Sequence, residues 1–348
     1  MVSPDKNSHQ QKGNTMKKIA FAGLRHGHIN SLYNEAVKSP ELEISAICEE
    51  DAEARQAFLS AHPESKAPVY TSLAQMLAEA DCDIVAIGDY YGKRGSVAIA
   101  ALKSGKHVIA DKPLCTSLDE LDQIEKLSKE KHLAVGLMLD LRTYDHFVKA
   151  RELVRSGQLG KITQIQFGGQ HPLLVGSRPH WYFEPGKHGG TINDIAIHAM
   201  DYIPWLTGQE IKSFAAARTW KAFDSGCDCF NDAAQFMLVL ENGCGVLGDV
   251  SYAEPDSHGY KMPQYWRFTV WGTKGVIEFN CIEKQIKAWI QGEAEPRMIE
   301  AEAYPGPRYL DWFLMDVDGK DAELDTALVL KRTRQTLELQ KLADASLA

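Results

Sequence analysis

The sequence predicts an α/β chain in which a doubly wound, parallel-sheet domain precedes an α+β domain with a large, mostly antiparallel open sheet. In the first part, short apolar runs such as residues 83–88 alternate with amphipathic helical stretches, which is typical of βαβ units. After about residue 160 the runs lengthen and alternate apolar with polar residues. Hairpin-like turns at 241–243 and 272–275 join several of these runs, which favours antiparallel pairing.

Strands and helices alternate along the first domain. Each expected strand is an apolar or alternating run, and each expected helix repeats apolar residues at three- and four-residue intervals. The strands are expected at residues 17–22, 42–48, 69–70, 83–88, 106–110 and 133–137. The helices are expected at residues 28–38, 52–59, 73–79, 97–104 and 118–129. Because βαβ crossovers are right-handed, this order predicts a sheet covered by helices on both faces.

The second domain is predicted from its longer strands and its aromatic content. Strands are expected at residues 162–167, 214–220, 233–240, 245–250, 266–271, 276–279 and 286–290, and a closing helix at 324–342. All seven tryptophans lie beyond residue 180, which marks a change in composition. We therefore expect a disordered polar leader at 1–15, a first domain at 16–138 and a second domain at 139–348, whose last helix packs back toward the first.

Composition excludes several classes of partner. The 38 basic and 47 acidic residues give a net charge of −9, which argues against nucleic acid or an anionic membrane as the main partner. No apolar run approaches the roughly 18 residues that a membrane span needs. The polar first residues do not resemble a secretory signal, and the seven cysteines are scattered, so we expect a cytoplasmic protein with reduced thiols. Cys227 and Cys229 lack a second cluster with zinc spacing.

The turn after the first expected strand is a degenerate dinucleotide-binding loop. It reads Gly23, Leu24, Arg25, His26, Gly27, His28. Gly23 takes the place of the first glycine in the G-x-G-x-x-G fingerprint, whereas Arg25 and His28 replace the second and third. The helix that follows still offers N–H groups to a phosphate. Arg25 could add charge there or block the backbone approach, so a fold that binds no dinucleotide remains the second interpretation.

Glu49 follows the second expected strand, 21 residues after His28. An acid about 20 residues beyond the loop is expected to bind the ribose hydroxyls, which favours NAD over NADP. A solvated side chain is an equal alternative, because Glu50 and Asp51 follow. NADP stays open because Arg25 could meet its additional phosphate.

Two further motifs resemble the Gfo/Idh/MocA oxidoreductases, the family of glucose–fructose oxidoreductase and inositol dehydrogenase. Residues 105–113 are similar to the family's G-K-H-V-x-x-E-K-P, and residues 189–201 to its G-G-x-L-x-D-x-G-x-H-x-x-D. The resemblance covers nearly the whole chain from Met16. It implies a Rossmann domain and NAD(P)(H)-dependent hydride transfer between a nicotinamide and a secondary alcohol of a sugar, polyol or cyclitol.

The resemblance places three catalytic residues, Lys112, Asp194 and His198, with Asp111 in the place of the family's glutamate. The chemistry of these residue types agrees. Asp194 and His198 are four residues apart and share one face of a helix. An imidazole can take a proton near neutral pH, and an ammonium can stabilise an alkoxide or polarise a carbonyl. Asp201, one turn beyond His198, is expected to be structural.

Other site residues are expected from their place in the pattern. Where the family has T-P-N and a histidine, this chain has residues 89–94, in which Asp89, Tyr90 and Arg94 are expected to contact the cofactor. The loop at 171–188 is expected to wall the substrate pocket. The expected pocket residues are Arg142, His180, Trp181 and Asn193. No metal is expected, because the spacing of His171, His180 and His188 fits no standard site.

Two other functions are kept beside the dehydrogenase. Some relatives retain NAD and oxidise transiently, so that elimination or glycoside cleavage proceeds without net redox change. A ligand-sensing protein without catalysis would also fit the degenerate loop. A homodimer or homotetramer through the second sheet is expected, because an open sheet needs cover on one face.

Overall fold

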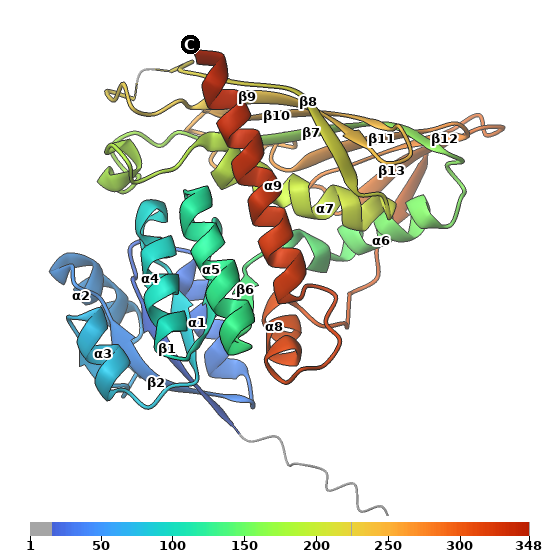
Figure 1. Cartoon of the computed structure of the whole chain (residues 1–348). Helices are drawn as coiled ribbons and strands as arrows, with labels where there is room; N and C mark the ends of the chain where they lie inside the picture. Colours follow the sequence, from blue (N-terminus) through green and yellow to red (C-terminus); the bar gives the residue numbers. More distant parts are fainter. Residues whose placement is uncertain (1–15, 224, 348) are drawn as a thin grey trace, which may run out of the picture.

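The computed structural model describes residues 16–223 and 225–347, and within them six parallel strands form the first sheet (Figure 1). The strands are β1 (Lys17–Ala22), β2 (Leu42–Cys48), β3 (Val69–Tyr70), β4 (Ile84–Ile87), β5 (His107–Ala110) and β6 (Val135–Leu137). Their order is β3-β2-β1-β4-β5-β6, that of a dinucleotide-binding Rossmann fold. The predicted leader at 1–15 lies outside the described residues.

Helices cover this sheet because each presents one apolar face. They are α1 (Ile29–Lys38), α2 (Ala52–Ala61), α3 (Leu73–Glu79), α4 (Tyr91–Lys103) and α5 (Leu118–Lys131). In α1 the buried residues are Ile29, Leu32, Tyr33 and Ala36, which lie at helical spacing. Helix α4 begins six residues before the predicted position. The prediction began too late because the first turns of the helix contain glycines and polar residues, which gave no clear helical signal.

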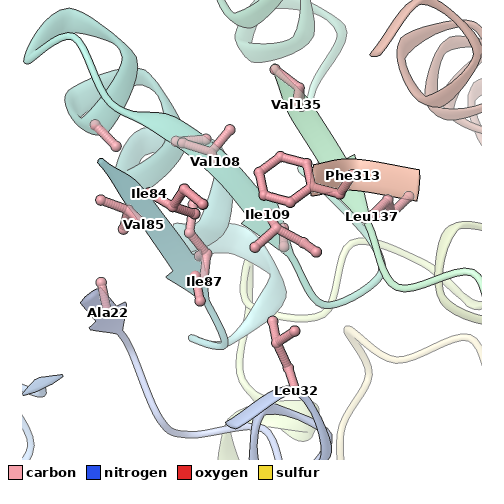
Figure 2. Packing of buried hydrophobic residues seen from close by; sticks show 14 of the residues in the cluster. Ala22, Leu32, Ile84, Val85, Ile87, Val108, Ile109, Val135, Leu137 and Phe313 are labelled. Carbon is pink, nitrogen blue, oxygen red and sulfur yellow. The ribbon is translucent and has the colours of Figure 1, made fainter. Parts of the chain in front are cut away.

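The centre of the first core lies on β4, β5 and β6, whose strand residues are nearly all buried. Figure 2 shows Phe313 beside Ile109 and Leu137 in this core. Phe313 belongs to α8 (Tyr309–Val317), a helix that the sequence analysis did not predict. A Cβ at Gly136 of β6 would lie 2.6 Å from the Phe313 ring, so this glycine allows α8 to pack directly on the sheet.

Eight strands of the described chain form the second sheet, in the order β14-β13-β12-β11-β7-β10-β9-β8. They are β7 (Ile162–Pro172), β8 (Ile211–Trp220), β9 (Ala233–Leu240), β10 (Gly245–Glu254), β11 (Arg267–Gly272), β12 (Gly275–Phe279), β13 (Gln285–Ile290) and β14 (Arg297–Glu300). Only β7 and β10 pair in parallel, so the sheet is mostly antiparallel as predicted. The sequence analysis did not predict β14.

Helices line one face of the second sheet, the face toward the first domain (Figure 1). They are α6 (Asp145–Arg155), α7 (Ile197–Thr207) and α9 (Thr326–Asp344). Helix α9 joins the two cores, because Val329 and Leu337 pack in the first cluster and Leu339 and Ala343 in the second. Short helical turns lie at η1 (Leu141–Thr143), η2 (His180–Phe183), η3 (Ile192–Ala196) and η4 (Ala345–Leu347).

Two further observations concern the cysteines and the membrane. Cys227 and Cys229 form a disulfide, so the prediction that all thiols are reduced is wrong for this pair; the two cysteines lie in one turn and can approach each other. The other five cysteines are free.

Across the described residues, none of the helices combines the length and hydropathy of a membrane span.

Candidate active site at the edge of the parallel sheet

The site lies where the strand order of the first sheet reverses, between β1 and β4. In open α/β sheets, ligands bind beyond the carboxyl ends of the strands at this point. Gly23, Glu49 and Asp111 directly follow β1, β2 and β5, and Asp89 lies two residues beyond β4. The fold therefore brings these four predicted cofactor residues to one edge.

The backbone of the degenerate loop keeps the shape of a dinucleotide-binding turn. Gly23 has a φ of +74°, and a Cβ there would lie 2.5 Å from the Cβ of Asp89, so only glycine fits. Close packing of helix on strand occurs at Gly88, where a Cβ would lie 2.4 Å from Ile29. Because Gly88 permits the approach that the third glycine of the fingerprint usually allows, His28 can occupy that position.

Backbone donors in this loop fit the pyrophosphate of a dinucleotide. The N–H groups of Arg25, Gly27 and His28 have no hydrogen-bond partner within the described part of the chain. They lie at the amino end of α1, where the helix dipole favours an anion. The loss of two fingerprint glycines has therefore not removed the phosphate-binding geometry.

Glu49 is buried, with 1% of its surface exposed, and is not the solvated residue of the alternative interpretation. Its carboxylate accepts hydrogen bonds from the N–H of Leu24 (2.6 Å) and of Asp51 (2.8 Å). The Arg25 guanidinium lies 3.3 Å from Glu49 and 5.2 Å from the centre of the Tyr90 ring. The Arg25 side chain is thus directed toward an acid and an aromatic face.

Asp194 is held by residues from both domains. The Lys112 ammonium donates to a carboxylate oxygen of Asp194 at 2.7 Å and to its backbone carbonyl at 3.1 Å. The Tyr252 hydroxyl donates to the other carboxylate oxygen, and His188 Nε2 lies 2.9 Å from that hydroxyl. Burial raises the pKa of Asp194, but Lys112 and His188 outweigh burial and hold this pKa well below its usual range. The carboxylate is therefore ionised and fixed.

His198 lies in the first turn of α7, one turn beyond Asp194. The predicted regular helix is interrupted here, because Asp194 belongs to a π-helical turn, η3. Such turns are frequent at functional sites. Burial lowers the pKa of His198 well below its ordinary value, and the nearby Lys112 and His28 lower it further, so the imidazole is neutral near pH 7. Its Nδ1 has no hydrogen-bond partner among the described residues.

These groups open into one cavity of about 530 Å³ between the two domains. The polar residues that line it include His26, His28, Lys112, His171, Asp194 and His198. The aromatic residues that line it are Tyr144, Tyr182, Tyr260, Tyr265, Trp266 and Tyr309. The structure thus brings Lys112, Asp194 and His198 together from distant parts of the chain.

The four predicted pocket residues do not line this cavity. Arg142 is buried and donates to Asp201 at 2.6 Å, so it forms a structural ion pair, and Asp201 has the structural role expected of it. Asn193 is buried and donates to the Cys115 carbonyl at 3.0 Å. His180 is exposed at the surface of η2.

Trp181 contacts the cofactor loop instead of the pocket. Its indole N–H donates to the Arg25 carbonyl at 3.4 Å, and its ring stacks on Tyr182 with centroids 4.1 Å apart. Tyr182 is the member of η2 that reaches the cavity. The prediction that this loop walls the pocket thus holds for Tyr182 but not for Trp181.

Sequence reasoning covered Arg178 and Tyr182 only as members of the 171–188 loop, and it missed Asp140. It also missed Tyr252 and His188, which orient Asp194. None of these residues belongs to a local motif. His171, the first residue of the loop expected to wall the pocket, does line the cavity, although it was discussed individually only as a metal ligand.

His26, His28 and Asp111 form a group whose ligand atoms lie within 4.8 Å of one another. Arg94, another of the predicted cofactor residues, is fully buried and donates to the Asp111 carboxylate at 2.9 Å and to the Asp111 carbonyl at 2.7 Å. The Arg94 guanidinium already neutralises the Asp111 carboxylate. A metal cation bound here would therefore have no negative charge left to neutralise its own. The arrangement fits a buried ion-pair network, and the absence of a metal stays a prediction.

Family comparisons agree with the fold and with the motifs. The family model described as the oxidoreductase family with an NAD-binding Rossmann fold matches residues 17–138. The model described as the Gfo/Idh/MocA C-terminal domain matches residues 147–278. Together the two models cover most of the described chain.

Curated relatives are distant. Levoglucosan dehydrogenase of Pseudarthrobacter phenanthrenivorans is 25% identical over 67% of this chain and 65% of its own. Inositol 2-dehydrogenase of Corynebacterium glutamicum is 28% identical over 83% of this chain and 86% of its own. An uncharacterized oxidoreductase of Schizosaccharomyces pombe is 27% identical over 50% of this chain. The chain spans 47% of the Schizosaccharomyces pombe relative and 65% of the levoglucosan enzyme, which is less than two thirds of each.

Solved structures share the whole fold. A structure from Thermotoga maritima superimposes with a TM-score of 0.82 at 23% identity, covering 94% of this chain and 98% of the other. Aldose-aldose oxidoreductase from Caulobacter crescentus superimposes with a TM-score of 0.76 at 18% identity, covering 95% and 98%. At these identities the likeness concerns the fold. With both family models matched, the chain belongs to the Gfo/Idh/MocA oxidoreductases and carries their NAD-binding Rossmann domain.

Proposed function

We propose that the protein is an NAD-dependent dehydrogenase that oxidises a secondary alcohol of a sugar, polyol or cyclitol, or reduces the matching ketone. One observation carries this proposal: Lys112 from the edge of the parallel sheet and His198 from α7 open into the same cavity, with Asp194 held between the domains. The cavity is large enough for a monosaccharide-sized ligand, since small-molecule sites start at about 300 Å³.

The loop N–H groups of Arg25, Gly27 and His28 would hold the cofactor's pyrophosphate, and Glu49 would hold a ribose. The remaining proposed cofactor contacts are Gly23, Leu24, His26, Asp89, Tyr90 and Lys112. The two other predicted contacts, Arg94 and Asp111, are fully buried against each other and would position this edge instead of touching the cofactor. When bound, the nicotinamide supplies the hydride acceptor. Glu49 favours NAD, because its buried charge would repel an added phosphate of NADP.

Proton transfer falls to the side chains in the cavity. A neutral His198 can accept the hydroxyl proton of an alcohol, because the residue lines the cavity and its imidazole is unprotonated near pH 7. The Lys112 ammonium can stabilise the developing alkoxide. Asp194 fixes the position of the ammonium through its 2.7 Å contact.

Two relatives support this substrate class, since their names identify dehydrogenases of levoglucosan and of inositol, which are cyclic polyols. Neither of the alternatives, redox-neutral elimination or ligand sensing, is favoured by the comparisons.

A steady-state assay tests the proposal. Purified protein is mixed with NAD or NADP and a panel of sugars, polyols and cyclitols, and NADH formation is followed at its absorbance band. We expect turnover with at least one member and a preference for NAD. Tight NAD binding without redox turnover on any member would overturn the dehydrogenase. Release of a cleaved product without a net absorbance change would identify the elimination reaction instead.

We also propose a homodimer or homotetramer formed through the outer face of the second sheet. Exposed apolar side chains on this sheet support it: Met237, Leu247, Trp289 and Met298. A cytoplasmic location is proposed from the five free cysteines and the acidic composition.

A further inference from the structure

Arg178 is a cation in the cavity that lacks a carboxylate partner. It lines the same cavity as Lys112, Asp194 and His198. Its Nε donates to the Leu173 carbonyl at 2.9 Å. Its Nη2 donates to the Pro172 carbonyl at 2.6 Å and lies 3.2 Å from the hydroxyl of Tyr260. Its Nη1 has no hydrogen-bond partner among the described residues.

The buried cations of the described chain are neutralised by acids, whereas Arg178 is only half-buried. Arg94 pairs with Asp111, Lys112 with Asp194, Arg142 with Asp201 and Arg332 with Glu210. Arg178 instead meets neutral oxygens and the faces of two rings, with its Cζ 4.6 Å from the centre of Tyr182 and 5.0 Å from that of Tyr252. A charge that is partly removed from water and has no counter-ion favours an anionic ligand in the cavity.

The position of Arg178 relates it to the reacting groups. Its guanidinium lies over Tyr252, and the hydroxyl of Tyr252 donates to the Asp194 carboxylate. One aromatic ring therefore separates the cation from the Lys112–Asp194 pair. Because Arg178, Lys112 and Asp194 line one cavity, a single ligand can contact both the cation and the pair.

We infer that the ligand of this cavity is a sugar acid, or another polyhydroxy acid, whose carboxylate is bound by Arg178. The inference rests on the proposed function, because it names the class of alcohol oxidised at the same site. The existing hydrogen bonds hold the guanidinium in place, so binding an anion costs little additional ordering. His171, which is buried and has an unpartnered Nδ1, offers a second polar contact.

A single carboxylate fits this site better than a phosphate or a neutral ligand. The cavity is lined by three cations, Lys112, Arg178 and Arg308, and by three carboxylates, Glu35, Asp140 and Asp194, so it carries no excess positive charge for a dianion. A wholly neutral sugar would leave the guanidinium uncompensated. Of the two cations that line the cavity without an acid partner among the described residues, Arg308 is exposed and Arg178 is half-buried, so a single carboxylate on the ligand would gain most at Arg178.

Binding measurements on matched pairs of ligands test the inference. The probes are D-gluconate, D-galactonate, D-glucuronate and D-galacturonate, each compared with the neutral compound that has a hydroxymethyl group in place of the carboxylate. Dissociation constants are measured by calorimetry for the wild type, Arg178→Gln and Arg178→Lys. The control is Arg218→Gln, which removes an exposed guanidinium that also lies over an aromatic ring, Trp220, away from the cavity.

We expect at least one acid to bind more than 10-fold more tightly than its neutral partner. Arg178→Gln should weaken that acid about 30-fold or more, the effect of removing one partner of a charged pair, and the neutral partner by less than 3-fold. Arg178→Lys should retain part of the preference, and Arg218→Gln should match the wild type. Unchanged melting temperatures establish that the variants are folded.

The inference is overturned if no acid binds more tightly than its neutral partner, or if Arg178→Gln weakens both members of a pair equally. The second result is what a purely structural role of Arg178 in its loop would give. NADH formation is recorded separately. Arg178-dependent binding of acids without NADH formation would uphold the inference and overturn the dehydrogenase. Oxidation of neutral polyols at a rate that Arg178→Gln does not change would uphold the dehydrogenase and overturn the inference.

Discussion

Lys112, Asp194 and His198 could be placed from sequence because each belongs to a contiguous motif. Tyr252 and His188, which hold Asp194, could not, because one lies on β10 and the other in a loop before η3. Arg142 and Asn193 were misplaced for the same reason. Whether a polar side chain faces a cavity or a buried partner depends on tertiary packing, and nothing in the neighbouring sequence records it.

Several histidines of the site are buried in the neutral state, which makes stability dependent on pH. Burial lowers the pKa of His26 to about 4 and that of His171 to about 3, from an ordinary value of 6.5. The unfolded chain therefore binds more protons than the folded chain between these values and 6.5. The free energy of unfolding must rise with pH through this window and fall as the pH drops below 6.5.

Replacing His171 by glutamine removes one of these protonation sites. Between pH 7.5 and pH 5, the free energy of unfolding of the wild type should fall by about 2 kcal/mol for each such histidine. That of His171→Gln should fall correspondingly less. Urea unfolding at the two pH values measures the difference. An identical loss in both proteins would show that His171 is protonated in the folded state.

At the scale of elements, the accuracy of the predicted bounds depends on how sharply the apolar pattern of each element ends. The ends of β1, β2 and β9 agree with the sequence analysis because an apolar run has clear limits. The first turns of α4 were missed because glycines there serve tertiary contacts. A Cβ at Gly92 would lie 2.1 Å from the Gly186 carbonyl oxygen. Helix α8 was missed because its residues are apolar on most faces and show no clear period.

The cofactor loop gives a prediction at this scale. Gly23→Ala should destabilise the fold by about 1 to 3 kcal/mol and abolish NAD binding, because the residue has a positive φ and its Cβ would clash with Asp89. Gly27→Ala is the matched control for stability, since its Cβ would meet no atom within 4 Å. Thermal unfolding and calorimetry with NAD compare the two variants. Equal stability of the two would contradict the tight turn.

At the scale of the molecule, the order of the two sheets was predictable from periodicity alone, whereas their junction was not. Helix α9 contributes to both cores, so the domains expected at 16–138 and 139–348 share an element. The cavity forms at this junction. Its existence could be predicted only through the family resemblance.

The exposed face of the second sheet predicts assembly. Leu247 is 51% exposed and pairs across the sheet with Met237, which is 44% exposed. Leu247→Glu should shift the protein toward monomer, because it places a charge in the proposed interface. Light scattering after size exclusion measures the mass. Val37→Glu on α1, where valine is also 51% exposed, should leave the mass unchanged.

The central claim is that an ammonium from one domain and an imidazole from the other act on one ligand beside the nicotinamide. A single-turnover measurement of absorbance at the NADH band, at saturating NAD, compares the wild type with Lys112→Met. We expect the variant to form NADH at least about 1,000-fold more slowly while its dissociation constant for NAD changes less than about 3-fold, since transition-state stabilisation is lost and binding is retained. Equal rates in the two proteins, or a parallel loss of rate and NAD binding, would contradict it.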